Sequence, residues 1–188
     1  MSKTIELFKV PVHFSELSID NEKFLKELKT IKVESRVISN KGGYQSKNLP
    51  LKHKSLKQFS KLVLEETNKF ADTINLKPIK KINNIWLNIN RYKDFNIAHD
   101  HPGCIFSGVY YLNTPENCGN INFLNPVMDH LQYYWEQNLK THNCFTSSEW
   151  WLPSKSGRLY IFPHFLKHYV EPNMNKDEPR ASLSFNLS

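Results

Sequence analysis

The chain has 188 residues, of which 39% are hydrophobic and 13% aromatic, and its formal net charge is +7. This length and composition fit one domain with a packed core and exclude a disordered protein or a disulfide-dependent scaffold. No stretch approaches the roughly 18 apolar residues that a transmembrane helix needs. No secretory leader is recognisable either, so we expect a cytoplasmic protein that does not bind membranes.

The positive charge raises the question of nucleic-acid binding. Most of the basic residues are lysines that are scattered along the chain, and the densest run is found within residues 77–81. Nucleic acid is therefore an alternative partner that we do not favour. The three cysteines form no CxxC pair and are expected to be reduced thiols: Cys104, Cys118 and Cys144.

The first third of the chain is predicted to be helical. After a candidate strand at Leu7–Val12, Asp20 is suited to cap a helix. The apolar face of that helix is Phe24, Leu25, Leu28 and Ile31. Ser55 and Gln58 fit a capping box that opens a second helix. Its apolar stripe is Leu56, Phe59, Val63 and Phe70. The glycine-bearing loop Ser39–Ser46 between them is either a plain turn or a loop that faces substrate.

From Asn84 onward the hydrophobic period changes to two, which is typical of β-strands. Apolar residues at 85, 87 and 89 alternate with Trp86, Asn88, Asn90 and Tyr92, so one face is apolar and the other polar and aromatic. The further predicted strands are Ile97–His101, Ser107–Leu112, Asn120–Phe123, Phe145–Trp151, Arg158–Phe162, Lys167–Val170 and Arg180–Asn186.

Glycine, proline and asparagine turns separate these short strands, which predicts a mainly β protein with N-terminal helices, a sandwich or jelly roll. No repeat, low-complexity segment or linker divides the chain. We therefore expect a single domain over 1–188, with a helical support region at 1–82 and a jelly-roll core at 83–188.

The strongest candidate for chemistry is the run His99-Asp100-His101. Residues two apart on a strand share a face, so both imidazoles point one way and Asp100 points the other. Neutral imidazoles are good metal ligands, and His168 lies far downstream, just before a turn. A close pair and a distant third ligand build a facial site that leaves about three positions open. Taken alone, the same run also fits a polar strand end.

A second candidate is Arg180, which opens the last predicted strand. Arg180, Ser182, Ser184 and Asn186 share one face of this strand. A buried arginine fork beside a hydroxyl is suited to holding a carboxylate with two hydrogen bonds. The alternative interpretation is a surface arginine on an edge strand.

These residues stand in two blocks that resemble prolyl-4-hydroxylase-type 2-oxoglutarate oxygenases. The first block is RYKDFNIAHDHPGCIFSGVYYLNTPENCGNINFLNP, residues 91–126, and the second is GRLYIFPHFLKHYVEPNMNKDEPRASLSFN, residues 157–186. They are still more similar to a group of 2-oxoglutarate/iron(II) oxygenases, many from marine bacteria and phages, that share HxHPG…SGVYYL and H-x-V-x-P-N…R-x-S-x-S-F-N. The resemblance covers about the last 105 residues and implies a double-stranded β-helix, a cupin-like jelly roll.

The resemblance also implies a role for individual residues. His99 matches the first iron ligand and His168 the distal one. Arg180 matches the arginine that pairs with the distal carboxylate of 2-oxoglutarate, with Ser182 and Tyr111 as hydroxyls beside that carboxylate. On the cavity wall Tyr92 matches an aromatic residue, and we add Asn88 and Asn90, on the same face, as co-substrate or substrate contacts.

One departure from the common pattern concerns the second metal ligand. Most of these oxygenases carry His-x-Asp or His-x-Glu, whereas this chain has His101 where the carboxylate belongs, as the closer group does. An imidazole there raises the net charge of the site by one and removes an acceptor for metal-bound water. Three arrangements stay open: a three-histidine iron site, which we expect, a site that binds iron weakly, or a ligand role for Asp100 through a local bulge.

The function that the resemblance implies is hydroxylation of a substrate with Fe(II), 2-oxoglutarate and O2, coupled to decarboxylation of 2-oxoglutarate to succinate. One alternative is a cupin-like three-histidine metal enzyme that does not use 2-oxoglutarate, for which Arg180 and Ser182 would have no purpose. The other is a non-catalytic β-sandwich binding protein.

The substrate and the assembly stay open at this stage. A small molecule, a peptidyl residue or a nucleic-acid base each fits as substrate, and we expect a monomer or a homodimer. The aromatic-rich insertion between 126 and 151 is predicted to form a lid or docking wall. For Trp150, packing in the core is the favoured interpretation.

Overall fold

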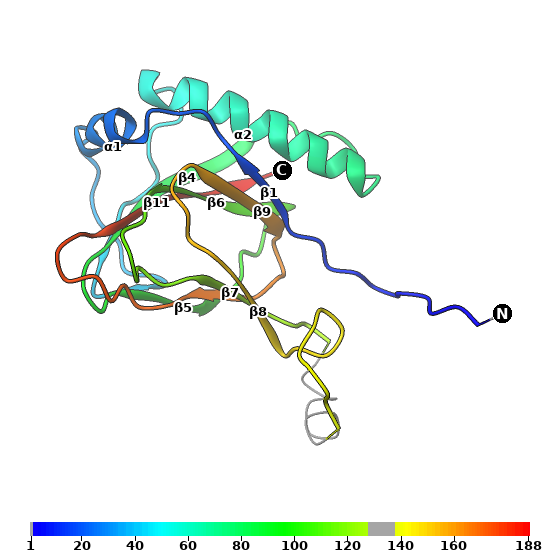
Figure 1. Cartoon of the computed structure of the whole chain (residues 1–188). Helices are drawn as coiled ribbons and strands as arrows, with labels where there is room; N and C mark the ends of the chain where they lie inside the picture. The colour runs from blue at the N-terminus through cyan, green and yellow to red at the C-terminus, as the bar shows by residue number, and fades with distance from the viewer. Residues whose placement is uncertain (1, 128–137) are drawn as a thin grey trace.

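The structure is a computed structural model that describes residues 2–127 and 138–188. Two antiparallel sheets face each other, and both helices cover the outer face of one of them (Figure 1). The six-stranded sheet has the order β1 (His13–Glu16), β9 (Arg158–Pro163), β6 (Phe106–Asn113), β11 (Arg180–Leu187), β4 (Ile82–Asn90) and β3 (Tyr44–Gln45). The five-stranded sheet has the order β2 (Asn40–Lys41), β5 (Phe95–His99), β10 (His168–Val170), β7 (Ile121–Leu124) and β8 (Glu149–Leu152).

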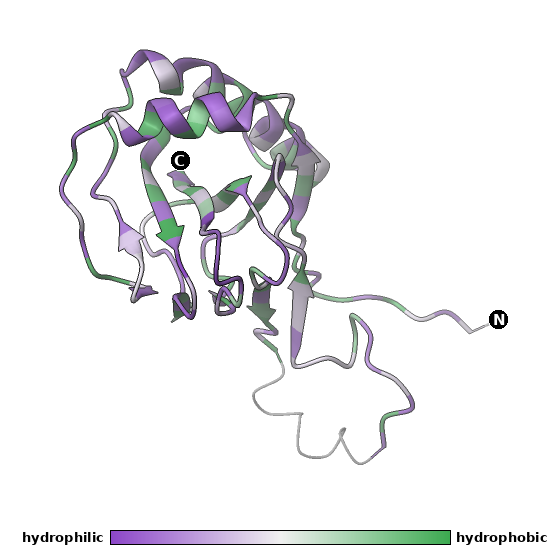
Figure 2. Cartoon of the chain, turned by 60° about the vertical axis from the view of Figure 1, so that its left-hand side comes forward, coloured by the Kyte–Doolittle hydropathy of each residue, from purple (hydrophilic) through white to green (hydrophobic). Residues whose placement is uncertain are grey.

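This mainly β architecture with helical cover confirms the predicted fold class. The helices are α1 (Asn21–Lys29) and α2 (Lys54–Thr73), and neither is both long and apolar enough to span a bilayer. Bands of hydrophobic and hydrophilic residues alternate along helices and strands (Figure 2). The apolar stripe of α2 is buried against the sheet as predicted: Leu56, Phe59, Val63 and Phe70.

At the start of each helix, a side chain accepts a hydrogen bond from a free backbone amide and so caps the helix. Asp20 caps α1 as predicted, and its Oδ1 accepts a hydrogen bond from the Lys23 amide at 3.1 Å. The predicted capping box of Ser55 and Gln58 is wrong. His53 is the capping residue of α2, because its backbone is extended and its Nδ1 accepts from the Ser55 amide at 3.3 Å. Helix α2 therefore begins at Lys54, one residue before Ser55, the hydroxyl residue that the sequence suggested as its cap.

Side chains alternate between the two faces of the six-stranded sheet, and each face packs in a different core cluster. On β4, β6 and β11, one set of side chains packs against the helices, among them Ile85, Tyr110 and Leu183. The alternate set points between the two sheets, where Tyr111 joins a second core cluster that includes Phe123. The face assignment predicted for β4 and β11 is therefore confirmed, and their polar face is the one turned to the interior of the sandwich.

Several strand bounds differ from the prediction by one or two residues, and β8 begins four residues later than predicted. The predicted strand Leu7–Val12 is wrong. Leu7 and Phe8 are 70% and 87% exposed, and Phe8 has a φ of +57°, which breaks an extended run. The first strand is instead β1, which pairs with β9 at the sheet edge. The core interpretation of Trp150 is also wrong, since this residue is 49% exposed on the edge strand β8.

The loop Ser39–Ser46 connects the two sheets. Asn40 pairs with Asn96 in the five-stranded sheet, whereas Tyr44 pairs with Ile89 in the six-stranded sheet. The loop therefore closes one side of the sandwich next to the candidate site. It is more than a plain turn, because Ser39 lines the cavity between the sheets.

Candidate metal and co-substrate site

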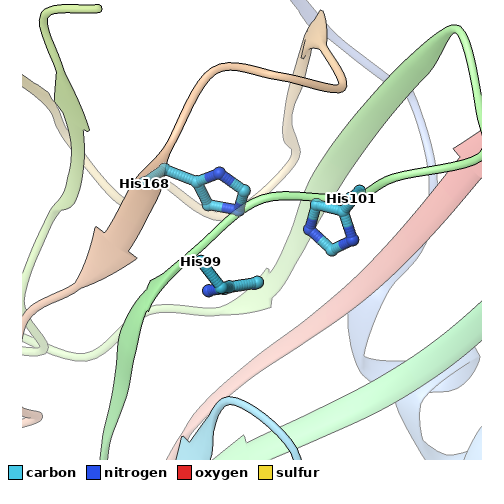
Figure 3. A group of neighbouring side chains, drawn as sticks. All are labelled: His99, His101 and His168. Carbon is cyan, nitrogen blue, oxygen red and sulfur yellow. The ribbon is translucent and has the colours of Figure 1, made fainter.

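Three imidazoles converge between the sheets, and we call His99, His101 and His168 the histidine triad (Figure 3). His99 ends β5 and His168 begins β10, where the two residues are direct cross-strand partners. His101 follows β5, and its backbone amide donates to the His164 carbonyl at 3.0 Å. The ligand atoms of the triad lie within 4.8 Å of one another. These three neutral donors and their spacing fit a divalent first-row metal ion.

Hydrogen bonds orient two members of the triad. The Nδ1 atom of His99 lies 2.7 Å from the Ile97 carbonyl, and Nδ1 of His168 lies 2.9 Å from the Leu166 carbonyl. A carbonyl oxygen can only accept, so each Nδ1 carries the proton and each Nε2 has a free lone pair. This is the tautomer that a metal ligand needs.

Burial keeps the triad uncharged. It lowers the pKa of His99, lowers that of His101 to about 4, and lowers that of His168 well below its ordinary value. The neighbouring imidazoles add to the shift of His101 and His168, since two positive rings so close would repel. The triad is therefore neutral near pH 7 and needs no deprotonation to accept a cation.

Arg180 lies in the same cavity on the facing sheet, and only 1% of its surface is exposed. Its Nη1 donates to the carbonyl of Cys118 and, at 2.9 Å, to that of Glu171. Its Nη2 is buried without a hydrogen-bond partner, and no carboxylate within the described ranges forms an ion pair with it. Burying a charge without a counterion raises the free energy of the folded state, so this end of the cavity is suited to bind an anion.

Gly119 allows the two carbonyls to reach Arg180 together. Its φ is +81°, and a Cβ atom there would lie 2.7 Å from the Glu171 oxygen and 2.8 Å from the Pro172 oxygen. Any side chain would push the turn after Cys118 away from the segment at Glu171. The guanidinium is thus held by backbone groups on one edge, which leaves its other edge to a ligand.

Tyr111 and Ser182 flank Arg180 on the interior face. They are cross-strand partners on β6 and β11, and both line the cavity. Burial raises the pKa of Tyr111 to about 12, so the phenol keeps its proton. Its hydroxyl is buried without a hydrogen-bond partner of good geometry among the described residues, and the Ser154 hydroxyl lies beside it and lowers its pKa slightly against the effect of burial. Two unsatisfied donors, the Tyr111 hydroxyl and Arg180 Nη2, therefore face one cavity, which fits a carboxylate group.

Comparison with known proteins agrees with this arrangement. A family model described as "Putative 2OG-Fe(II) oxygenase" matches residues 84–186, more than half of the chain. The chain belongs to this family. The matched segment begins in β4 and ends in β11, so it contains the histidine triad, Arg180, Tyr111 and Ser182. No curated protein matches the sequence of this chain significantly.

Solved structures share the fold of this chain at low sequence identity. A prolyl-4-hydroxylase from Pseudomonas putida is 12% identical with a TM-score of 0.65, over 95% of this chain and 92% of that one. A 2OG-Fe(II) oxygenase family oxidoreductase from Burkholderia pseudomallei is 13% identical with a TM-score of 0.62, over 94% and 84%. The viral collagen prolyl hydroxylase of Paramecium bursaria Chlorella virus-1, in complex with 2OG, is 14% identical with a TM-score of 0.56, over 94% of each chain.

The remaining predicted site residues lie in different places. Asn88 lines the cavity; its Nδ2 donates to Ser184 at 3.0 Å, and its buried Oδ1 is unpaired. Asn90 is buried but does not line the cavity, because it holds the loop at Asn40 through a 3.1 Å hydrogen bond. Tyr92 lies beyond the end of β4, 37% exposed and also outside the cavity lining.

Asp100 is exposed and lies outside the ligand cluster. No bulge turns it inward, since β5 ends at His99 and the next inward residue is His101. The structure therefore supplies three histidines to this cluster and no carboxylate. Of the aromatic insertion, Tyr133, Tyr134 and Trp135 lie outside the described residues.

The sequence argument missed several residues of the cavity wall, which include Ser39, Trp86, Asn96, Val109, Ile121 and Phe162. Trp86 could have been found, because the alternation on β4 places it on the same face as Asn88. Its indole lies 5.7 Å from the His101 ring, measured between ring centroids. Asn96 and Ile121 face the site from the opposite sheet, which no single-strand pattern predicts.

Proposed function

We propose that the chain is an Fe(II)- and 2-oxoglutarate-dependent oxygenase that hydroxylates a substrate. The histidine triad would hold the metal, and Arg180 with Tyr111 and Ser182 would hold the distal carboxylate of 2-oxoglutarate. When bound, the metal and co-substrate supply the oxidising chemistry, with decarboxylation of 2-oxoglutarate to succinate. The observation that carries the proposal is a buried guanidinium, with no counterion in the described part of the chain, in the same cavity as three converging imidazoles.

The side chains of this cavity would have different roles. Arg180 would recognise the carboxylate through its unpaired Nη2, on the edge that the backbone carbonyls leave free, and it stays charged whatever the pH of the cell. Tyr111 adds a neutral hydroxyl donor, because its raised pKa keeps the proton on the oxygen. Val109, Ile121 and Phe162 add apolar surface to the cavity wall between the sheets. Away from bulk solvent the charge-assisted contacts are stronger than in water.

The three-histidine ligand set changes the charge balance of the site. A site with one carboxylate ligand would reduce the charge of a divalent metal by one, whereas the triad leaves it at two. The anionic co-substrate therefore provides the neutralisation that a protein carboxylate provides elsewhere. We expect metal and 2-oxoglutarate to bind with positive coupling, each raising the affinity for the other.

Anaerobic titration tests the proposal without turnover. Adding 2-oxoglutarate to the Fe(II)-loaded protein should produce a new visible absorption band, since chelation of Fe(II) by a 2-oxo acid is coloured. The band should reach its maximum at one equivalent of 2-oxoglutarate per chain. It should be absent when Fe(II) is left out. Glutarate, which lacks the ketone, is the matched control and should give no band.

Two rivals make different predictions for this titration. A cupin-like three-histidine enzyme that does not use 2-oxoglutarate would bind Fe(II) but develop no band. A non-catalytic β-sandwich protein would bind neither the metal nor the co-substrate. Arg180 favours the oxygenase over both, because neither rival requires a buried anion clamp.

A further inference from the structure

We infer that Arg36 binds an anionic group of the primary substrate, a carboxylate or a phosphate, at the mouth of the cavity. This inference rests on the proposed function, because it assigns the second ligand of the same site. Arg36 precedes the family-matched segment 84–186 and belongs to neither sequence block that points to the oxygenases.

The strand register places Arg36 on the interior face of the six-stranded sheet. Ser35 bridges Ser46 in antiparallel fashion, and the Arg36 amide donates to the Gln45 carbonyl at 2.8 Å, so Arg36 stands opposite Gln45. Direct cross-strand partners share a face. The successive partners form one row across the sheet: Tyr111, Ser182, Asn88, Gln45 and Arg36. Arg36 thus lies at the sheet edge of the row that contains Tyr111 and Ser182.

The guanidinium of Arg36 lies over an aromatic ring of the site. Its Cζ atom is 5.2 Å from the centroid of the Trp86 ring. Trp86 in turn contacts His101, with ring centroids 5.7 Å apart, and it lines the cavity. A planar guanidinium stacked on an indole keeps its outer donors free for a ligand, which a flexible lysine ammonium does not do as well. One aromatic residue therefore connects Arg36 to the metal side of the cavity.

Arg36 has no protein counterion within the described ranges. None of the ion pairs found there includes it, and the nearby Glu34 pairs with Lys47 instead. Its Nε is buried without a hydrogen-bond partner, while the residue as a whole is only partly buried. A cation that is fixed by its backbone and by stacking, yet unpaired, is suited to recognise an anion from outside.

Arg36 does not itself line the cavity that contains Arg180; its guanidinium lies over Trp86, which does. Trp86 pairs with Ser184, and Asn90 pairs with Arg180, so the rows of Trp86 and Arg180 are four residues apart. At roughly 3.3 Å per residue this is about 13 Å along the strands. One dicarboxylate held at Arg180 would not occupy the guanidinium over Trp86. Arg36 is therefore available to the substrate whose bond is to be oxidised.

Arginine side-chain NMR tests the inference in the intact protein. The chain has four arginines, at 36, 91, 158 and 180, so their Nε–H signals can be resolved and assigned by single substitutions. The protein is loaded with Zn²⁺ and saturated with 2-oxoglutarate, and is then titrated with acetate or with methyl phosphate at constant ionic strength. We expect a saturable shift of the Arg36 signal with an apparent Kd at least about tenfold lower than that of the exposed Arg91.

The two anions identify the chemistry of the substrate group. A response to acetate alone indicates a carboxylate, a response to methyl phosphate alone indicates a phosphate, and a response to both indicates a general anion site. Calorimetry with the same anions on Arg36→Gln and Arg36→Lys should show the binding heat lost in the first and weakened in the second. An Arg36 signal that responds no more than Arg91 would overturn the inference.

The same spectra separate this inference from the proposed function. Addition of 2-oxoglutarate to the Zn²⁺-loaded protein should shift the Arg180 signal before any second anion is present. If Arg180 does not respond, the proposed function fails. If Arg180 responds and Arg36 does not, only the assignment of Arg36 fails.

Discussion

Replacing His168 by alanine is expected to lower the affinity for Fe(II) by at least about 100-fold, because even the loss of a hydrogen-bond partner of a metal ligand costs about 10–100-fold. His168 is the most buried member of the triad, 5% exposed, and its Nδ1–H is fixed by the Leu166 carbonyl. No other imidazole of the described chain belongs to the cluster and could replace it. Anaerobic calorimetry with Fe(II) measures the loss, and His168→Gln repeats the test with a side chain of similar size.

Two matched variants make this result specific. His142→Ala removes an exposed imidazole outside the cluster and should bind Fe(II) as the wild type does. Asp100→Ala should likewise keep its affinity, whereas His101→Ala should lose it. Full metal binding by His101→Ala together with a loss in Asp100→Ala would contradict the three-histidine site and support a carboxylate ligand.

Arg180→Ala is expected to weaken 2-oxoglutarate binding by roughly 10- to 100-fold for each hydrogen bond lost, since a bond to a charged group contributes about 1.5–3 kcal/mol. Metal affinity should be spared, because the Arg180 side chain is not among the ligand cluster. Arg180→Lys keeps the charge but loses the planar fork, so its loss should be intermediate. Titration of 2-oxoglutarate into the Mn²⁺-loaded variants measures each effect.

A milder variant and a control distinguish a loss of 2-oxoglutarate binding from misfolding of the variant. Arg180→Ala also leaves the carbonyls of Cys118 and Glu171 without their donor, so its unfolding temperature is measured alongside. Tyr111→Phe removes only an unpaired hydroxyl and should give a smaller loss in the same direction. Arg158→Ala removes an arginine that pairs with Glu16 and should not change co-substrate affinity. Wild-type affinity in Arg180→Ala would favour the cupin-like alternative.

Much of the site could be predicted because it depends on short-range alternation. The period of two on β4 and β11 correctly places Asn88 and Ser182 on the interior face. The spacing of His99 and His101 also predicts two neighbouring imidazoles, which the structure brings together although His101 lies just beyond the end of β5. The prediction for β4 and β11 needs only the geometry of single strands. The contact with His168 does not follow from local alternation, because 66 residues separate it from His101 in the sequence.

The residues that were missed depend on contacts between segments. Arg36 is positioned by the neighbouring bridge of Ser35 to Ser46 and by its own hydrogen bond to Gln45 of β3, and β3 in turn pairs with β4. No local pattern around Arg36 predicts this path. The predicted strand at Leu7–Val12 fails for the opposite reason. Its apolar composition suits a strand, but the segment has no pairing partner, since β1 already occupies the edge beside β9.

Tyr92 shows the limit of extrapolating a strand. The alternation from Trp86 through Asn90 continues to Tyr92 in the sequence, yet β4 ends at Asn90. A turn follows, in which Asp94 accepts a 2.7 Å hydrogen bond from the Arg91 amide and Lys93 has a φ of +69°. The Tyr92 ring therefore turns away from the cavity, and Lys93 and Lys176 lie over it.

The most direct test of the central claim is the release of succinate from 2-oxoglutarate by the air-exposed protein, with Fe(II) and no added substrate. The account predicts slow release that requires Fe(II), is absent in His168→Ala, and needs a higher concentration of 2-oxoglutarate in Arg180→Ala. No succinate above the background of free Fe(II), or equal release by wild type and Arg180→Ala at low 2-oxoglutarate, would contradict it.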